Sequence, residues 1–460
     1  MPTDSIIHNL EKIFTDIQRP FAPLGGSFVV HHQGHCVLNT SMGTANIIDG
    51  NLLPWTADTL CLNYSTGKGV LVTLIHMLVS KGLLAYDKPI GHYWPEFATN
   101  GKADITLRAV LSHQAGLFAI TDIASSNVEL LDWQQMLKKV EQMPTKGHGG
   151  YLSAYSALVS GWVLGGLVEK VTHLSLQKAL DTYLAKPLGI KGSIFFELPQ
   201  SLINTMAVPQ AYFTDGKNDG DKQTNHKTDG QQSRHHKPTY RQDTPEILAI
   251  YQSLPSHDCW QALINTHQQE VNTASINGLY FNGKNMSIEH YKTAMTPERK
   301  VAINYHQQHV LTSKIPAANC VASANALAAI YDMLASGGYH QGNMLIDKQT
   351  FEQLSTIATQ QSTSNLAAPK NLAVRKNLAA PKNHDAVMPA NMAWRLGYHR
   401  IFSVCHDVTH GFGHMGYNGS VAWCDPSRHL SMVYVHNFDT TMLTDIRQFA
   451  LTEAVLSLVK

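Results

Sequence analysis

Strand patterns lie near both ends of this chain of 460 residues, and helical patterns dominate between them. Near the N-terminus, Ser27–His31 and His35–Asn39 flank Gln33-Gly34, which is typical of a β-hairpin. Near the C-terminus, Val421–Trp423 and Met432–His436 also predict strands. This arrangement predicts an α/β (α+β) fold. We expect one antiparallel sheet built from both termini, with flanking helices and an inserted helical lobe.

Amphipathic helical patterns open and close the chain. Apolar residues with helical spacing occur near the N-terminus at Ile6, Leu10, Ile13, Phe14 and Ile17. A second set near the C-terminus consists of Ile446, Phe449, Ala450, Ala454 and Leu458. Residues with these spacings share one face of a helix, so each segment predicts a helix with one apolar face.

Ser65 and Lys68 form an S-x-x-K pattern where a buried helical pattern begins. Residues three positions apart share one face of a helix, so the lysine amine is expected beside the serine hydroxyl. A serine hydroxyl needs a neighbouring base to become a nucleophile. A helix-capping serine followed by a solvated lysine is the alternative. A phosphate-binding loop is excluded, because Leu62 and Gly69 occupy positions where that motif needs Gly and Ser or Thr.

Further motifs flank this pattern on both sides. Pro54-Trp55 to Asp58-Thr59 precede it. The motifs that follow it are, in order, Leu78 to Lys88-Pro89, Tyr93-Trp94-Pro95-Glu96-Phe97 and Leu111-Ser112-His113-Gln114-Ala115-Gly116-Leu117. The succession resembles the β-lactamase-related serine hydrolases, which include class C β-lactamases, family VIII carboxylesterases and D-amino-acid peptidases. The resemblance runs from about Gly25 to Asn437. It implies a β-lactamase/transpeptidase-like fold and an acyl-enzyme on Ser65 with Lys68 as part of the base.

That family carries a second motif around a tyrosine about 90 residues after the serine. The matching residue is Tyr155, which precedes an apolar segment rich in small residues. The resemblance implies that Tyr155 acts together with Lys68 as the base. Tyr151 lies close by and competes for the role. We favour Tyr155, because a tyrosine that opens such a helix is the family arrangement. A core tyrosine with a satisfied hydroxyl is the alternative.

The third motif of the family is Lys-Thr-Gly on a strand, and the matching stretch here departs from it. His414 replaces the lysine and Met415 replaces the threonine, whereas Gly416 is retained. The resemblance assigns His414 and Gly416 to substrate binding and the backbone N–H groups of Ser65 and Tyr417 to the oxyanion hole. We expect an imidazole exposed beside the pocket and mostly neutral, which disfavours the carboxylate of a β-lactam.

Composition excludes several other classes of function. A net charge of +1 gives no reason to expect nucleic-acid or membrane partners. The chain has no G-x-S-x-G, no H-E-x-x-H and no cysteine cluster, so no α/β-hydrolase elbow, metal or cofactor is predicted. No apolar run approaches a membrane span, and no signal peptide is visible. These features predict a cytoplasmic protein whose oligomeric state stays open.

The six cysteines are widely spaced along the chain. They are Cys36, Cys61, Cys259, Cys320, Cys405 and Cys424. We interpret them as small buried thiols in a reducing compartment, with disulfides as the alternative.

The whole chain, 1–460, is expected to form a single catalytic unit. Its sheet lobe comprises 20–67 and 390–460, and its mainly helical lobe comprises 68–210. Two segments are expected to be flexible surface insertions. Residues 215–241 are almost purely polar, and 362–386 contains three tandem copies of a six-residue repeat such as Asn-Leu-Ala-Ala-Pro-Lys.

Together these patterns predict a serine hydrolase, most simply a carboxylesterase on small or short-acyl esters. A β-lactamase or D-stereospecific peptidase is the enzymatic alternative. A non-catalytic penicillin-binding-like protein is the other alternative, although Ser65, Lys68 and Tyr155 are all present. The expected partner is a small-molecule ester or amide substrate.

Removal of Lys217–His236 is expected to leave the melting temperature nearly unchanged, because this polar segment offers little apolar surface to a core. Thermal unfolding of the deletion variant beside the full chain measures this. A large fall in melting temperature would show that the segment packs against the protein.

Overall fold

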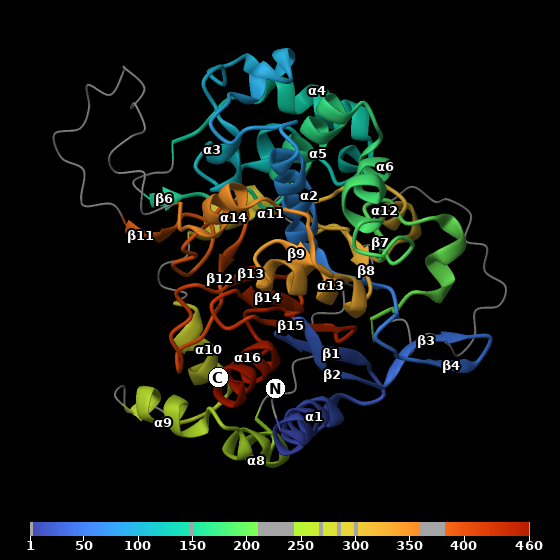
Figure 1. Cartoon of the computed structure of the whole chain (residues 1–460), viewed down its shortest axis with the longest axis vertical. Helices are drawn as coiled ribbons and strands as arrows, with labels where there is room; N and C mark the ends of the chain where they lie inside the picture. Colours follow the sequence, from blue (N-terminus) through green and yellow to red (C-terminus); the bar gives the residue numbers. More distant parts are fainter. Residues whose placement is uncertain are drawn as a thin grey trace.

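The two ends of the chain pair in the central sheet of this computed structural model (Figure 1). Strand β1 (Gly26–His32) runs antiparallel to β15 (Leu430–His436), with Gly26 opposite His436 and His32 opposite Leu430. The pairing confirms a sheet built from both termini. The structure describes residues 3–147, 151–209, 243–265, 270–282, 287–298, 302–358 and 382–459, with side chains omitted at 382 and 383.

The central sheet has six strands in the order β12-β13-β14-β15-β1-β2. The bounds of the other four are β2 (His35–Met42), β12 (His399–Arg400), β13 (Phe412–Met415) and β14 (Val421–Asp425). Every pairing in it is antiparallel. The predicted N-terminal hairpin is therefore confirmed as β1 and β2, and the two predicted C-terminal strands are confirmed as β14 and β15.

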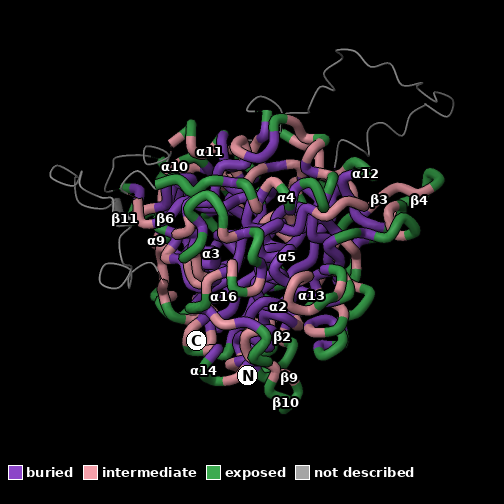
Figure 2. The backbone as a smooth tube through the Cα atoms, turned by 90° about the horizontal axis from the view of Figure 1, so that it is seen from above, coloured by how far each residue is buried: buried purple, intermediate pink, exposed green. Residues whose placement is uncertain are grey.

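Short strands form the remaining sheets. They are β3 (Thr44–Ile48) with β4 (Asn51–Pro54), β6 (Tyr151–Ser153) with β11 (Lys382–Asp385), β9 (Tyr339–His340) with β10 (Asn343–Met344), and β8 (Val321–Ala322) between β5 (Cys61–Leu62) and β7 (Ile194–Phe195). The β3–β4 hairpin projects from the body of the protein, and its tip is exposed (Figures 1 and 2).

Helices lie on both sides of the central sheet and in a separate group above it in Figure 1. The helices are α1 (Asp4–Gln18), α2 (Lys68–Ser80), α3 (Leu107–Leu111), α4 (Trp133–Gln142), α5 (Val159–Thr172), α6 (Leu176–Leu180), α8 (Pro245–Ser253), α9 (His257–Asn265), α10 (Thr273–Tyr280), α11 (Ile288–Met295), α12 (Gln308–Leu311), α13 (Ala324–Ala335), α14 (Lys348–Ser355) and α16 (Arg447–Leu458). Both predicted terminal helices are confirmed, as α1 and α16.

Successive side chains of the central strands enter two different cores. Val29 and its partner Val433 pack in the core that contains residues of α2 and α13. Phe28, Val30 and Met432 pack in the core that contains residues of α1 and α16. Because neighbouring side chains of a strand point to opposite faces, this alternation buries the sheet on both sides. Figure 2 shows the buried residues concentrated in the interior.

A buried ion pair joins the C-terminal helix to the N-terminal one, which lies beside it (Figure 1). Arg447 at the start of α16 donates hydrogen bonds to both carboxylate oxygens of Asp445. The same guanidinium donates to Gln18 at the end of α1 over 3.0 Å, and it lies 4.4 Å from the centroid of the Phe21 ring. Burial raises the pKa of Asp445, but the charge of Arg447 outweighs it and the pKa is lowered overall.

A disulfide joins Cys259 of α9 to Cys405 in the loop after β12. The interpretation of all six cysteines as buried thiols is therefore wrong for these two. It is also wrong for Cys36 on β2, which is a free but exposed thiol. The remaining three cysteines are buried and free, as expected.

One predicted insertion ends earlier than expected. Lys382–Asp385 form strand β11, which pairs in parallel with β6, so the end of the 362–386 segment belongs to the folded body. The part of that segment before residue 382 lies outside the described residues, as does the whole of 215–241.

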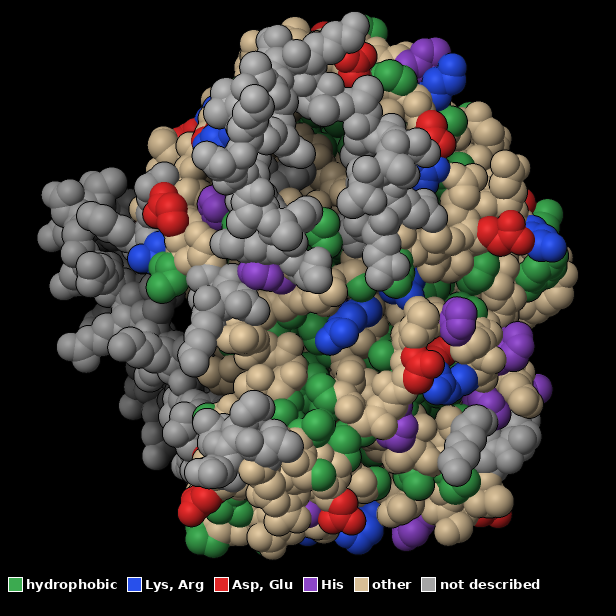
Figure 3. Space-filling view, turned by 90° about the vertical axis from the view of Figure 1, so that its left-hand side faces the viewer, with side chains coloured by type: hydrophobic (Ala, Val, Ile, Leu, Met, Phe, Trp, Pro, Cys, Tyr) green, Lys and Arg blue, Asp and Glu red, His purple; other side chains and the backbone are tan. Residues whose placement is uncertain are grey.

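Charged side chains are dispersed on the face that Figure 3 shows. On the part of the face in Figure 3 that is not grey, acidic and basic side chains are scattered and do not gather in a patch of one sign. None of the helices in the described ranges combines the length and the apolar character that crossing a bilayer requires.

Replacement of Asp445 by Ala is expected to cost roughly 3–5 kcal/mol of unfolding free energy, because it leaves the Arg447 guanidinium buried and unpaired. The double variant Asp445→Ala/Arg447→Met should recover most of that loss. Since the pKa of Asp445 is lowered on folding, the stabilisation is complete at neutral pH. It should disappear only as the pH falls below the ordinary aspartate pKa of about 3.9. Urea unfolding at several pH values measures both effects, and a double variant as unstable as the single one would contradict the explanation.

Candidate active site

Ser65 and Lys68 lie side by side at the start of α2. Ser65 is on a single 3₁₀ turn, Tyr64–Gly67, and Lys68 is the first residue of the α-helix that continues from it. The Lys68 Nζ is 2.9 Å from the Ser65 Oγ. The predicted proximity is therefore present, although Ser65 precedes the α-helix and does not form part of it.

The amine of Lys68 is buried without a charged partner. Lys68 is only 4% exposed. In the part of the chain that the structure describes, no carboxylate forms an ion pair with its amine. Its one hydrogen bond to the backbone donates to the Ala317 carbonyl oxygen over 2.6 Å. Burial lowers the pKa of Lys68 well below its usual range. A neutral amine beside a serine hydroxyl is a base of the kind that the chemistry needs.

Tight packing holds the turn that carries the serine. The side-chain amide of Asn63 donates to the carbonyl oxygens of Cys61 and Ala322 over 2.9 and 3.0 Å. A Cβ at Gly67 would lie 2.2 Å from the Cβ of Cys320, so only glycine fits there. Tyr64 adopts a φ of +46°, a left-handed conformation that is uncommon for a residue with a side chain. These contacts fix the direction of the serine hydroxyl.

Tyr155 is buried beside the serine and the lysine. Its ring centroid is 5.0 Å from the Lys68 Nζ, and its hydroxyl is hydrogen-bonded with Ser65. Burial raises the pKa of Tyr155, the hydrogen bond with Ser65 lowers it, and the negative charge of Asp385 raises it further. The expectation that Tyr155 opens a helix is wrong, because it lies in the loop between β6 and α5, and α5 begins only at Val159.

Aromatic side chains enclose the Tyr155 ring. The Trp394 ring stacks on it with centroids 5.3 Å apart and an angle of 15° between the planes. The His113 ring meets it edge-on at 5.0 Å, and the His113 Nδ1 accepts a hydrogen bond from the Ser156 N–H. Burial lowers the pKa of His113 to about 3, and the nearby charge of Lys68 acts in the same direction. This histidine is therefore neutral at ordinary pH.

The loop after β13 packs directly on the serine-bearing turn. Thr66 donates from its hydroxyl to the Ser420 carbonyl oxygen over 3.0 Å. A Cβ at Gly416 would lie 2.8 Å from the Asn63 carbonyl oxygen, so Gly416 permits this close approach. The backbone N–H groups of Ser65 and Tyr417 have no backbone acceptor among the described residues. These two donors remain available for an oxyanion, and Tyr417 is 43% exposed.

His414 on β13 departs from its predicted setting. It is 2% exposed, so the expectation of an imidazole exposed beside the pocket is wrong. The Nδ1 faces the Met415 carbonyl oxygen at 3.2 Å, and the Nε2 has no hydrogen-bond partner within the described ranges. Burial, followed by the charge of His399 and of Lys68, lowers the pKa of His414 well below its usual range. The imidazole is neutral, and a lysine in its place would be a second buried amine close to Lys68.

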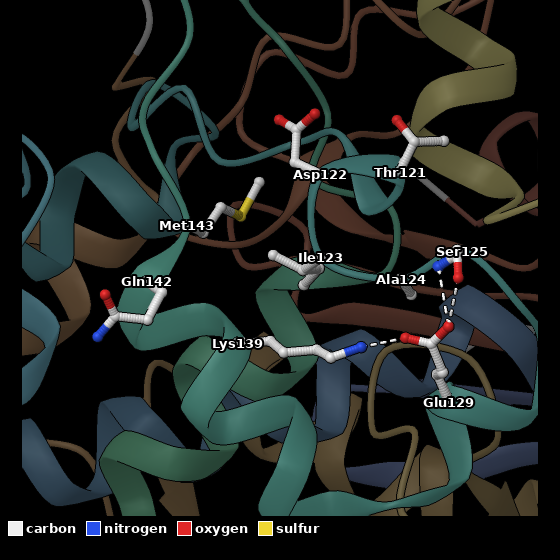
Figure 4. Close-up of a pocket in the computed structure, with 9 residues that line it drawn as sticks. All are labelled: Thr121, Asp122, Ile123, Ala124, Ser125, Glu129, Lys139, Gln142 and Met143. Atoms are coloured by element: carbon white, nitrogen blue, oxygen red, sulfur yellow. Dashed lines mark hydrogen bonds and ion pairs between the residues drawn. The ribbon is translucent and has the colours of Figure 1, made fainter.

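A separate pocket of about 370 Å³ lies in the helical lobe (Figure 4). It is lined by residues of α4 and of the loops before it: Thr121, Asp122, Ile123, Ala124, Ser125, Glu129, Lys139, Gln142 and Met143. Figure 4 shows Lys139 and Glu129 paired with each other across it. The hydrogen bond from Lys139, together with those from Ser125, lowers the pKa of Glu129 to about 2, so this carboxylate is ionised and hydrogen-bonded. None of the predicted catalytic residues lines this pocket.

Sequence patterns missed several residues that complete the site. Ala317 offers only a backbone carbonyl, which has no sequence signature. Trp394 and Asp385 follow the repeat segment, where nothing in the pattern marks them as part of a site. Only His113 carried a signal, since it lies inside the Leu-Ser-His-Gln-Ala-Gly-Leu motif.

Comparison with known proteins now identifies the family. A family model described as Beta-lactamase matches residues 14–456. The chain belongs to the β-lactamase family. This membership confirms the resemblance and the predicted fold class.

Related proteins of the β-lactamase family include enzymes with esterase names. Esterase/beta-lactamase LipL of Mycobacterium tuberculosis is 27% identical over 435 residues, which is 92% of this chain and 81% of LipL. Esterase EstB of Burkholderia gladioli is 27% identical over 203 residues, covering 41% of this chain and 51% of EstB. A solved family VIII carboxylesterase has a TM-score of 0.70 at 21% identity, covering 100% of this chain and 99% of its own. A penicillin-binding protein homologue from Caulobacter crescentus has a TM-score of 0.65 at 24% identity, covering 98% of this chain and 97% of its own.

Proposed function

We propose that this protein is a carboxylesterase that cleaves small or short-acyl esters through an acyl-enzyme on Ser65. One observation carries the proposal. The amine of Lys68 is buried, has no ion-pair partner among the described residues and lies 2.9 Å from the Ser65 hydroxyl. An ester is attacked at its carbonyl carbon only when the serine loses its proton. A neutral amine held at hydrogen-bond distance is suited to take that proton.

In the first step Lys68 acts as the base. Its amine donates one N–H to the Ala317 carbonyl oxygen over 2.6 Å, which leaves the nitrogen lone pair for Ser65. The Ser65 oxygen bonds to the ester carbonyl carbon, and its proton moves to the Lys68 nitrogen. The carbonyl oxygen becomes negative and receives the N–H groups of Ser65 and Tyr417. One such donor contributes about 2.7–4 kcal/mol to lowering a barrier of this kind.

Tyr155 serves as the proton donor for the leaving alcohol. Burial and the charge of Asp385 keep its hydroxyl protonated, and that hydroxyl is hydrogen-bonded with Ser65. When the ester C–O bond breaks, the alkoxide takes the Tyr155 proton and leaves as an alcohol. The ammonium of Lys68 then returns a proton to Tyr155. Water repeats the sequence on the acyl-enzyme, which releases the acid and restores Ser65.

The neutral surroundings of the serine favour esters over β-lactams. A β-lactam carries a carboxylate, and the neutral His414 supplies no full positive charge to it. The name of LipL includes both activities, so β-lactam hydrolysis is the second candidate. A weaker relative is named as a D-alanyl-D-alanine carboxypeptidase, so peptidase activity is a third outcome that the same test can reveal.

The cytoplasmic location predicted from the sequence stays a prediction. The Cys259–Cys405 disulfide argues against it, because disulfides persist mainly in oxidising compartments. The expected partner is a small-molecule ester.

A fluorophosphonate probe is expected to label the wild type on Ser65 alone, and Ser65→Ala should lose both labelling and ester hydrolysis while its melting temperature stays the same. Peptide mass spectrometry locates the adduct. A p-nitrophenyl short-chain ester and a chromogenic cephalosporin are then compared, and kcat/KM for the ester should be higher by at least about a hundredfold. An adduct on another serine would refute the site, and faster cephalosporin turnover would replace the esterase function with the second candidate.

Activity is expected to fall on the acid side as Lys68 takes up a proton, since only the neutral amine acts as the base. Because burial lowers the pKa of Lys68, this loss should lie well below the ordinary lysine pKa of about 10.4. His113 and His399 have pKa values lowered by burial to about 3 and about 4, so neither titrates there. A pH profile of kcat/KM for the ester should therefore show a one-proton acid limb. A limb that begins only below about pH 5 would assign the base to another group.

A further inference from the structure

Asp385 is a buried carboxylate whose two oxygens accept five hydrogen bonds. It is 1% exposed and lies at the end of β11, three residues after the last repeat copy. No Lys or Arg forms an ion pair with it in the described part of the chain. A buried charge without a counter-charge is costly, so hydrogen bonds alone must compensate for its lost hydration.

The donors to the first oxygen come from two backbone segments. The Asp385 Oδ1 accepts the Tyr155 N–H over 3.0 Å. It also accepts the N–H groups of Val387 and Met388 over 2.8 and 3.1 Å. This oxygen therefore fixes the backbone of Tyr155 to the turn that follows β11.

The donors to the second oxygen are side chains on either side of Tyr155. The Asp385 Oδ2 accepts the Ser153 hydroxyl over 2.6 Å and the Trp394 Nε1–H over 3.1 Å. Trp394 is also the ring that stacks on Tyr155. One carboxylate thus holds both the backbone of Tyr155 and the ring that covers its side chain.

The geometry points to Asp385 as a positioning residue that orients the Tyr155 phenol toward Ser65 through the Tyr155 N–H and the stacked Trp394 ring. Its negative charge also acts against formation of the Tyr155 phenolate. The inference rests on the proposed function, because it assigns Tyr155 to the role of proton donor and leaves Lys68 as the base. Asp385 does not touch the reacting atoms and acts only through Tyr155.

Among the ionisable groups around Tyr155, Asp385 is the one whose negative charge acts on the phenol. His113 packs against the ring from the loop after α3, and His414 packs against it from β13. Both imidazoles have pKa values lowered by burial and are neutral during an assay. Tyr291 of α11 also influences the pKa of Tyr155, but burial raises the pKa of Tyr291 itself, so it stays uncharged as well.

The test replaces the charge while it keeps the shape. In Asp385→Asn, the amide oxygen can still accept the three backbone N–H groups, but its NH₂ group would face the Trp394 N–H. The double variant Asp385→Asn/Trp394→Phe removes that clash and retains a stacked ring. Asp425→Asn is the control for loss of a buried carboxylate, because Asp425 lies at the end of β14 and is bound by Ser427 and Arg428.

The double variant is expected to lose about 10- to 100-fold in kcat on the p-nitrophenyl ester, with KM changed less than about threefold, since misplacement of a catalytic group by about 1 Å costs this much. The fall of kcat/KM at high pH as the Tyr155 phenol ionises, the alkaline limb, should move to lower pH in this variant, because a negative charge no longer opposes the phenolate. Trp394→Phe alone keeps the charge and should leave the alkaline limb in place. Asp425→Asn should leave both kcat and the limb unchanged.

An alkaline limb and a kcat that match the wild type in the folded double variant would overturn the inference. If Asp385→Asn does not fold, Ser153→Ala/Trp394→Phe removes both donors to the second oxygen and keeps the charge. That variant should lose kcat at constant KM, and an unchanged kcat would overturn the positioning role.

Fluorophosphonate labelling of Ser65 in the wild type separates the two proposals. Absence of labelling refutes the proposed function, whereas labelling with an unaffected double variant refutes only the role of Asp385.

Discussion

The antiparallel pairing of β1 with β15 is the interaction on which the rest of the structure depends. It brings the two ends of the chain together and makes one sheet with both faces buried. On one face the sheet supports α2, which begins with Lys68. From the same sheet, β13 leads into the loop that contains Gly416 and packs on the turn of Ser65. The proposed nucleophile, its base and the proposed oxyanion donors therefore come from segments that this sheet brings together.

Burial determines the chemistry that the site can perform. Lys68 is removed from water, and no carboxylate among the described residues forms an ion pair with it, so its neutral form is favoured. Tyr155 is also buried, which favours its neutral form, the phenol. The same physical cause thus prepares an amine that can accept a proton and a hydroxyl that can donate one. The negative charge of Asp385 further favours the neutral phenol of Tyr155. Asp385 does not contact the Lys68 amine directly.

The sequence predicted those parts of the fold that have a local periodicity. Alternating strands such as β1, and the apolar face of α1, require only residues that are neighbours in the chain, and both were found. The S-x-x-K spacing likewise placed Lys68 beside Ser65. The setting of Tyr155 was predicted less well, because a loop has no periodicity and its apolar neighbours resembled a helix start. Asp385 was assigned to an insertion, because the polar and repetitive residues before it hid a short strand.

The sequence by itself determined which chemical groups are present and which of them share a helical turn, since spacing along a helix fixes distance between near neighbours. Tertiary structure alone decided the protonation states of Lys68 and Tyr155 and the burial of His414, because these depend on how much water remains around each group. It also decided the contacts of Asp385 with Tyr155 and Trp394. Such contacts join segments that are distant in the chain, and no local pattern of residues encodes the distance between them.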